Sequence, residues 1–139
     1  MALGWIWMLG LWVGLVNLSD PPVSLKTLHW KHRVVLYFPA EANSWTEPSK
    51  ELTQELRERK LLYWVYAKNV NSNSKYVLLD KEISQLRQQY AKNLSEDLWI
   101  LIGLDGGVKA HGQSELNWGT IFKLVDGMPM RRSEIQKNG

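Results

Sequence analysis

The chain has 139 residues, of which 45% are hydrophobic and 22% charged, a composition typical of a chain that folds around one compact core. It contains no cysteine, which excludes disulfide bonds, thiolate metal sites and thiol redox chemistry within the chain. The formal net charge of +3 permits weak attraction to polyanions, but no block of like charges resembles a nucleic-acid-binding tail, so we expect no nucleic-acid partner.

The first residues form an uncharged, strongly apolar run. Ala2 to Val16 read ALGWIWMLGLWVGLV, and polar residues begin abruptly at Asn17. The run is shorter than the roughly 20 apolar residues of a membrane-spanning helix, so residues 1–19 are predicted to be an export signal. No Lys or Arg precedes the run and no small-x-small cleavage pair follows it, so an uncleaved hydrophobic anchor and a buried N-terminal helix remain as alternatives. We therefore expect an exported protein (periplasmic, cell-envelope or secreted) that meets a membrane only through this segment.

Residues 20–139 are predicted to form one domain. A short helix near Ser24 to Leu28 precedes the first strand. Three short apolar runs have the β-branched and aromatic residues of strands covered on both faces: Arg33 to Phe38, Leu61 to Tyr66 and Leu98 to Ile102. The sequence Asp105-Gly106-Gly107 indicates a tight turn, so a fourth strand from Val108 onward is predicted to pair antiparallel with the third.

Two helices are predicted between these strands. Pro48 suits the first turn of a helix that runs to about Arg59. Asp80 is a plausible N-cap of the next helix, whose apolar residues keep helical spacing as far as Leu94. The polar stretch from Lys68 to Lys75 is predicted to be a mobile loop.

A last helix follows the hairpin. Ser114 can cap it, and Gly127 is predicted to be its C′ glycine, followed by Pro129, which cannot continue a helix. The resulting order, β-α-β-α-β-β-α, has crossovers long enough for parallel pairing and one closing hairpin. It predicts an α/β, thioredoxin-like fold with a central mixed sheet and a C-terminal hairpin plus helix. A flavodoxin-like sheet is disfavoured because it would not end in a hairpin.

Three stretches carry a likeness to a known family: KHRVVLYFPA from Lys31, LIGLDGGVKAHG from Leu101 and IFKLVDGMPMRRSE from Ile121. Over Leu25 to Gln136 the chain resembles the bacterial exported domain-of-unknown-function family that shares a C-terminal MPMRR motif. That family is similar to the thioredoxin-like P-DUDES domains of vertebrate sushi-repeat and coiled-coil-domain extracellular matrix proteins. The resemblance implies a thioredoxin-like fold and an extracytoplasmic setting, and it implies no established activity.

The chain departs from working thioredoxins at two places. The segment FPAEANSWTEPS from Phe38 has no Cys-x-x-Cys, and KNLSEDLW from Lys92 lacks the proline that would be cis beside a redox site. Thioredoxin, glutaredoxin and peroxiredoxin activities are therefore excluded, and we expect no cofactor.

In a thioredoxin-like topology, five segments would meet at the end of the sheet opposite the loop that follows the first strand. We call this end the basic pole, because it would gather Lys31, His32, Arg57, Arg59 and Lys60 around the candidate site. The candidate ligand-binding residues are Arg33, Asp105, Gly106, Gly107, Lys109, Met130, Arg131 and Arg132. We hypothesise that they bind a small anion, a glycan or an acidic protein through arginine forks and the backbone N–H groups of the glycine turn. Alternatively, Arg131 or Arg132 pairs with Asp105 or Asp126 and serves as a structural clamp.

Other candidate sites are weaker. The three histidines, His29, His32 and His111, lack an accompanying carboxylate motif, so no metal site is predicted. Glu41, Glu47, Glu96 and Asp97 could supply an acidic pair for catalysis or for a hard cation, but we favour the interpretation that they are solvated loop charges. Trp45 lies in a polar loop and is a candidate exposed contact residue.

No phosphate-binding loop, nucleophile elbow, zinc-protease motif or dinucleotide fingerprint is present. The function predicted from the sequence is a non-redox, thioredoxin-like binding module of the cell envelope. An extracytoplasmic enzyme of non-redox chemistry and a purely structural envelope protein are the alternatives.

Overall fold

The computed structural model describes residues 20–41 and 45–138. The predicted export signal, residues 1–19, lies outside the described residues. Within the described ranges, no helix combines the length and the apolar character needed to cross a membrane.

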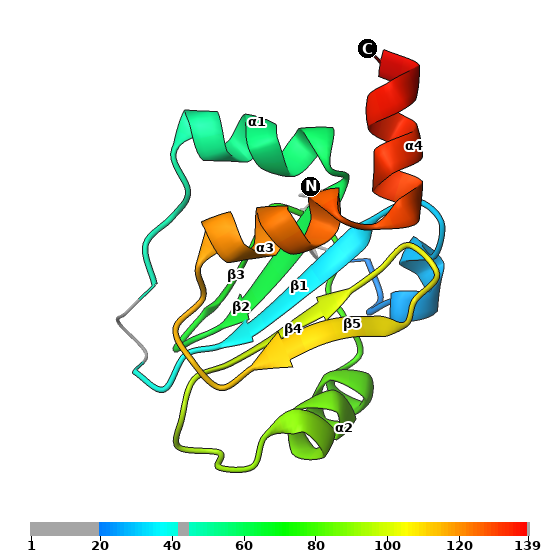
Figure 1. Ribbon diagram of the computed structural model, residues 1–139. Helices are drawn as coiled ribbons and strands as arrows, with labels where there is room; N and C mark the ends of the chain where they lie inside the picture. Colours follow the sequence, from blue (N-terminus) through cyan, green and yellow to red (C-terminus); the bar gives the residue numbers. More distant parts are fainter. Residues whose placement is uncertain (1–19, 42–44, 139) are drawn as a thin grey trace, which may run out of the picture.

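A mixed α/β structure of five strands and four α-helices is formed by the described part of the chain (Figure 1). In chain order the elements are η1 (Leu25–Leu28, a 3-10 helix), β1 (Arg33–Phe38), α1 (Lys50–Glu58), β2 (Leu61–Tyr66), β3 (Val70–Ser72), α2 (Asp80–Tyr90), β4 (Leu98–Ile102), β5 (Val108–Gly112), α3 (Trp118–Asp126) and α4 (Pro129–Asn138).

The strands form one mixed sheet in the order β3-β2-β1-β4-β5. Strand β1 runs parallel to β2 and antiparallel to β4, while β3 and β5 pair antiparallel at the two edges. The register sets Arg33 beside Leu61, and Val34 beside Ile102. The starts of β1, β2 and β5 and the end of β4 therefore lie at the same end of the sheet.

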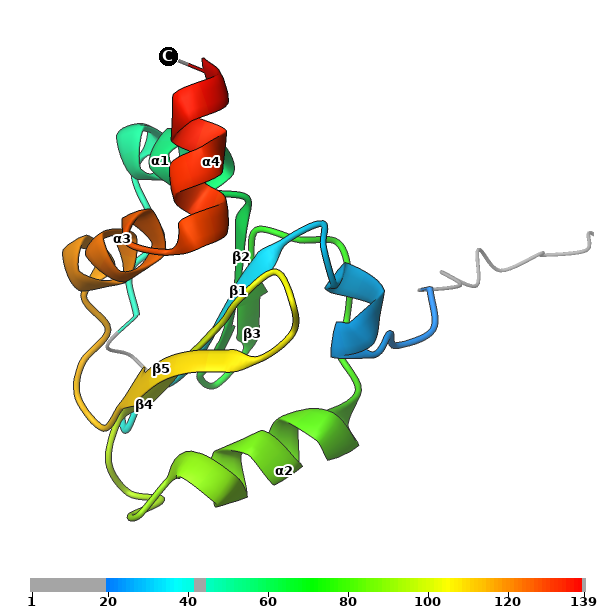
Figure 2. The same cartoon turned by 45° about the vertical axis from the view of Figure 1, so that its right-hand side comes forward.

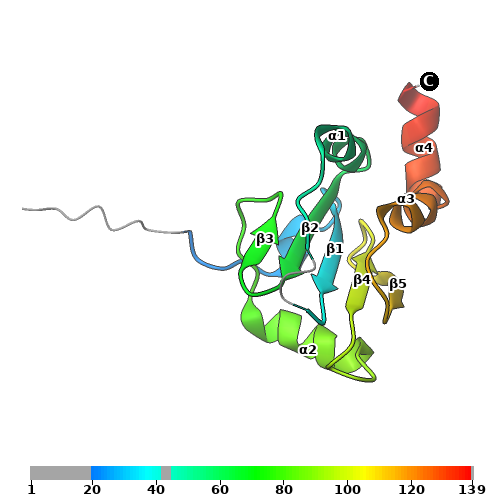
Figure 3. The ribbon, with the colours of Figure 1, turned by 90° about the vertical axis from the view of Figure 1, so that its left-hand side faces the viewer.

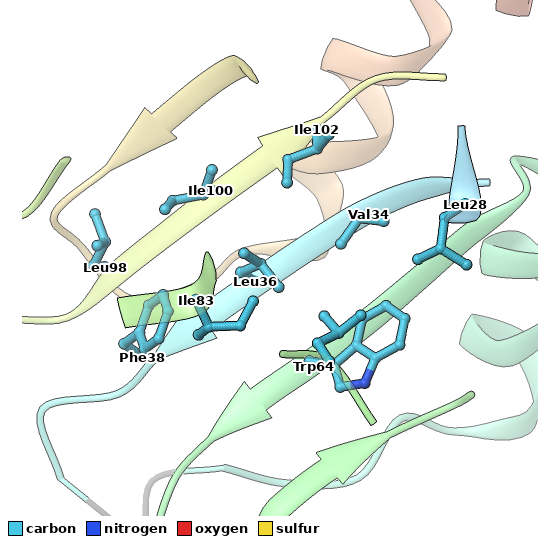
Figure 4. Packing of buried hydrophobic residues seen from close by; sticks show 10 residues of the cluster. Leu28, Val34, Leu36, Phe38, Trp64, Ile83, Leu98, Ile100 and Ile102 are labelled. Carbon is cyan, nitrogen blue, oxygen red and sulfur yellow. The ribbon is translucent and has the colours of Figure 1, made fainter. Parts of the chain in front are cut away.

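Helices cover both faces of the sheet, which explains why the central strands are apolar throughout. Figures 2 and 3 show α2 on one face and α1 and α3 on the other. Every residue of β1 is buried, and alternate side chains enter two separate cores. Val34, Leu36 and Phe38 pack toward α2, beside Ile100 of β4 (Figure 4). Val35 and its neighbours on the other face pack against α1 and α3.

The three central strands and the closing hairpin are confirmed with the predicted bounds. Gly106 adopts φ +80, the left-handed conformation that a glycine reaches without steric cost. The turn is closed by a hydrogen bond in which Gly103 N donates to Gly107 O at 2.9 Å.

The prediction of a loop over residues 68–75 is wrong, because Val70–Ser72 form the edge strand β3. Two hydrogen bonds from one side chain explain the pairing. Asn73 Oδ1 accepts from Tyr63 N at 2.8 Å, and Asn73 Nδ2 donates to Leu61 O at 3.1 Å, which extends the ladder beyond the strand. An exposed edge strand needs no apolar run, so the polar composition gave no sign of it.

Helix α2 differs from the prediction at both ends. Asp80 is its first residue, while the cap position belongs to Leu79, which forms no side-chain cap hydrogen bond. The helix ends at Tyr90 and does not reach Leu94, which is exposed. The side chain of Gln113 accepts hydrogen bonds from two backbone N–H groups just after the helix, and these bonds favour the turn over another helical turn.

Caps of the other helices also differ in detail. Helix α1 is capped by Ser49, whose Oγ accepts from Leu52 N at 3.3 Å, so Pro48 lies before the cap. Helix α3 is capped by Asn117 rather than Ser114, whose hydroxyl instead accepts a hydrogen bond from Trp99 Nε1 at 3.3 Å.

Helix α3 ends at Asp126, just before Gly127, as predicted, but Gly127 does not adopt the predicted left-handed conformation. Gly127 has φ −80 and ψ −9, so it is not a left-handed C′ glycine. Pro129 does not simply terminate the helix, because it opens α4. A proline suits the first turn of a helix, where its missing N–H leaves no bond unmade. The MPMRR motif therefore joins two helices.

Replacing Gly106 by alanine should destabilise the protein, because the turn would hold the alanine at φ +80, where a side chain is strained, and its Cβ would meet His29 Nε2 at 1.9 Å. We expect a loss of about 1 to 2 kcal/mol in the free energy of unfolding, measured by urea denaturation. Gly107→Ala is the matched control, since its nearest contact would be Asp105 Oδ1 at 3.3 Å, and it should cost about 0.5 kcal/mol or less. Equal losses in the two variants would contradict this account of the turn.

Candidate functional site

Four of the eight predicted site residues line one pocket at the basic pole, between the β4–β5 turn and the start of α4. The pocket has a volume of about 270 Å³. Its lining residues are Arg33, Gly103, Leu104, Asp105, Lys109, Met128, Pro129 and Met130. We call it the Arg33 pocket.

The other four predicted residues lie near the pocket without lining it. Gly106 and Gly107 form the adjoining hairpin turn. Arg131 is buried among carboxylates, whereas the neighbouring Arg132 is exposed. The side chain of Arg132 makes no hydrogen bond or ion pair with residues 20–41 or 45–138.

The backbone at this end of the sheet is strained at two non-glycine residues. Trp30 has φ 66 and Lys60 has φ 52, in the left-handed region that side chains rarely adopt. Each strained turn is held by a hydrogen bond: Trp30 N donates to Leu104 O at 2.6 Å, and Arg33 N donates to Lys60 O at 2.8 Å. These bonds fix the start of β1 against the β4–β5 turn and against the start of β2.

The guanidinium of Arg33 is almost completely buried, with 1% of the residue exposed. Its Nη1 donates to Arg59 O at 2.9 Å and lies 3.3 Å from Glu134 Oε2. Its Nε and Nη2 are also buried, and they have no hydrogen-bond partner within residues 20–41 and 45–138. A buried charged group with unmet donors is costly to the fold.

A second buried arginine, Arg59, has its full set of partners. Its Nε and Nη2 donate to the two carboxylate oxygens of Asp126 at 3.0 and 2.9 Å, and Nη1 donates to Glu55 O at 3.0 Å. Its guanidinium also lies 4.4 Å from the ring centre of Phe122. This bidentate geometry is the strongest form of an arginine–carboxylate contact.

Arg131 is the third buried arginine and ties α4 to the rest of the domain. Its Nε donates to Asp126 Oδ1 at 3.2 Å, and its Nη1 donates to Glu58 O at 3.0 Å. The same Nη1 lies 3.5 Å from Glu134 Oε2. We call Arg33, Arg59 and Arg131 with Asp126 and Glu134 the arginine cluster. The predicted clamp between Arg131 and Asp126 is therefore present.

Burial and hydrogen bonding act in opposite directions on Asp126. Burial alone would raise the pKa of its carboxyl, but hydrogen bonds from Arg59 and Arg131 outweigh that effect and hold the pKa below its ordinary value. At the pocket rim, hydrogen bonds from Lys109 Nζ and from Gly107 N lower the pKa of Asp105. Lys109 Nζ lies 2.7 Å from Asp105 Oδ2, so these two rim charges neutralise each other.

Sequence reasoning missed the role of Glu134 and four of the pocket residues. The missed lining residues are Gly103, Leu104, Met128 and Pro129. Glu134 could have been found by treating Pro129 as the first residue of a helix, because the three-residue spacing from Arg131 then sets both side chains on one helical face. The four lining residues carry no chemical signal of their own, since apolar and glycine residues acquire this role only through the fold.

The histidines do not form a cluster. His29 packs against Gly106, and the ring of His111 lies 4.7 Å from that of Tyr90. In the described ranges, no group of three or more His, Asp or Glu residues is arranged to hold a metal ion.

Trp45, in the loop at the opposite end of the sheet, is not the exposed contact residue that the sequence suggested. Trp45 is partly buried, with ring centres 5.5 Å from Tyr63 and 6.4 Å from Trp118. It packs against the core beneath α1 and α3 and is not a free contact residue. Among the acidic residues, Asp97 accepts a hydrogen bond from the backbone N–H of Ala40, which gives it a structural role.

The two adjacent arginines of the MPMRR motif should differ sharply when removed. Arg131→Ala leaves Asp126 and Glu134 short of a buried partner and should lower the free energy of unfolding by about 3 kcal/mol. Arg132→Ala removes an exposed side chain and should change it by about 0.5 kcal/mol or less. Urea denaturation of the two variants measures both values, and similar losses would contradict the clamp.

Stability should fall in acid because of Asp126. A carboxyl whose folded-state pKa is depressed adds stability above its unfolded pKa, near 4, and loses that contribution as pH falls through the folded value. Asp126→Asn should therefore lose less stability than the parent protein between about pH 5 and about pH 2. Denaturation midpoints across this range provide the measurement, and parallel profiles for parent and variant would show that other carboxyls carry the effect.

Residues 24–134 match the family described as Domain of unknown function (DUF4174). The matched segment begins at Ser24, the cap of η1, and ends at Glu134 of the arginine cluster, so it includes the whole Arg33 pocket. Neither the curated proteins nor the solved structures gave a match. Because the matched segment covers most of the chain, the protein belongs to the family Domain of unknown function (DUF4174).

Proposed function

We propose that the protein is a non-redox, thioredoxin-like binding module that takes an anionic group into the Arg33 pocket. The sheet order supports the thioredoxin-like assignment, because β2-β1-β4-β5 combines one parallel pair with a closing antiparallel hairpin. The helices support it as well, since α2 covers one face and α1 and α3 the other (Figure 3). The absence of cysteine leaves such a domain without thiol chemistry.

The setting belongs to the same proposal. The apolar run before Asn17 supports export to the cell envelope or beyond, in line with the resemblance to P-DUDES domains of extracellular matrix proteins. The partner that carries the anionic group would then be a small anion, a glycan or an acidic protein outside the cytoplasm.

One observation carries the binding proposal: Arg33, which has two buried guanidinium donors without a partner in the described part of the chain, is one of the residues that line the cavity. Arg33 Nε and Nη2 lack partners within the described ranges, and Arg33 lines the pocket. A bound anion would satisfy these donors and offset the cost of the buried charge. The residues of the arginine cluster hold the guanidinium in place, so the site is organised before a ligand arrives.

The lining favours binding over acid–base catalysis. Asp105 is the one carboxylate among the lining residues, and it is hydrogen-bonded to Lys109. Its lowered pKa keeps it ionised at neutral pH, where a general acid or base needs a pKa near the working pH.

Calorimetric titration of the full-length chain with sodium acetate, sodium phosphate and sodium sulfate tests the proposal. We expect saturable binding of at least one anion, weakened about tenfold in Arg33→Lys, which keeps the charge but removes the fork. Arg132→Lys is the matched control and should bind like the parent, since Arg132 lies outside the pocket. Equal binding by Arg33→Lys, or absence of binding both by these three anions and by longer alkyl carboxylates, would favour a purely structural role for the basic pole.

A further inference from the structure

Arg59 and Arg33 use the same edge of the guanidinium in different ways. In Arg59, Nε and Nη2 hold the two oxygens of one carboxylate, Asp126, at 3.0 and 2.9 Å. In Arg33 the same two atoms have no partner within residues 20–41 and 45–138, and the residue is even more deeply buried. The protein itself therefore shows which group fits this edge: a planar carboxylate that accepts two parallel hydrogen bonds.

The geometry points to a monocarboxylate with a short apolar chain as the ligand of the Arg33 pocket. Its two oxygens would reach Arg33 Nε and Nη2 once the side chains that cover these two buried donors move aside. This inference rests on the proposed function, because it names the class of anion that the same pocket takes. The carboxylate forms no covalent bond and is held by the fork alone.

The apolar walls of the pocket specify the rest of the ligand. Leu104, Met128, Pro129 and Met130 contribute hydrocarbon and thioether surface. Methionine side chains adapt to chains of varied shape, so they suit an alkyl body. The side chains of these four residues offer no donors for the additional oxygens of a phosphate or a sulfate, whereas a carboxylate has two oxygens and the fork serves both.

The charge at the rim also favours a single negative charge. Lys109, the other cation of the lining, is paired with Asp105 at 2.7 Å, so it is not free to neutralise a second ligand charge. A dianion would leave one charge unmatched beside apolar walls, which is costly.

The volume of the Arg33 pocket limits the length of the ligand's alkyl chain. An apolar cavity of roughly 150 Å³ accommodates benzene, which has six carbon atoms. In proportion, the 270 Å³ of the Arg33 pocket accommodates roughly ten non-hydrogen atoms. Octanoate has that size, with its carboxylate at the fork and its chain along the methionines.

A chain-length series on the full-length protein tests this inference. Acetate, butanoate, hexanoate, octanoate and dodecanoate are titrated by calorimetry below their micelle concentrations, with octyl sulfate as the control for the head group and 1-hexanol as the neutral control. We expect affinity to rise up to about fourfold per methylene as far as octanoate and then to level off. Octyl sulfate and 1-hexanol should each bind at least about tenfold more weakly than the carboxylate of the same chain length.

Two matched variants assign the effect to the pocket. Met130 and Ile135 both belong to α4 and are both 46% exposed, but only Met130 lines the pocket. Met130→Ala should reduce the gain in affinity per methylene, and Ile135→Ala should leave the series unchanged. Arg33→Lys should weaken octanoate about tenfold.

The outcomes separate the two proposals. Acetate binding that depends on Arg33 but does not strengthen with chain length would overturn the inference and leave the proposed function standing. Octyl sulfate binding as tightly as octanoate would overturn the choice of a carboxylate. Absence of binding by every anion would overturn both proposals.

Discussion

The basic pole depends on the pairing of three buried guanidinium groups with three carboxylates, those of Asp126, Glu134 and Glu55. Arg33, Arg59 and Arg131 are the buried charged residues of the described chain, and Asp126 and Glu134 contact all three between them. Removing charges of this size from water costs several kcal/mol each, so neither carboxylate can be lost without a large penalty. The guanidinium groups also donate to the backbone carbonyls of Glu55, Glu58 and Arg59 at the end of α1. The cluster thus joins β1, α1, α3 and α4.

The structural role of the MPMRR segment and its proposed part in the pocket are consequences of one arrangement. Because Arg131 fixes the first turn of α4, Pro129 and Met130 take their places in the pocket wall. Arg131 therefore acts as a positioning residue, and Arg33 is the residue with donors to offer. The clamp and the binding surface were alternatives in the sequence. The clamp is formed by Arg131 and the proposed binding donors belong to Arg33, so the two do not exclude each other.

Patterns of apolar residues in the sequence correctly predicted the three central strands. The strands at Arg33–Phe38, Leu61–Tyr66 and Leu98–Ile102 are buried on both faces, so their apolar runs were visible in the sequence. The edge strand Val70–Ser72 and the helix α4 were missed because both depend on partners distant in the chain. The candidate site followed the same division. Convergence at the basic pole could be inferred from strand direction, whereas the burial of Arg33 and its pairing with Glu134 required the tertiary fold.

The contact between Arg33 and Glu134 joins residues 101 positions apart, one at the start of the first strand and one in the last helix. Such a contact closes a loop that spans nearly the whole domain. The entropic cost of closing this loop is lower once the intervening elements have formed, because less of the loop is then flexible. During synthesis the ribosome delivers Glu134 last among the residues of the cluster. Until Glu134 docks, Arg33 has no carboxylate at its Nη1, so the charge balance of the arginine cluster is incomplete. Docking of α4 therefore completes the charge balance of the cluster, and the same docking forms one wall of the pocket.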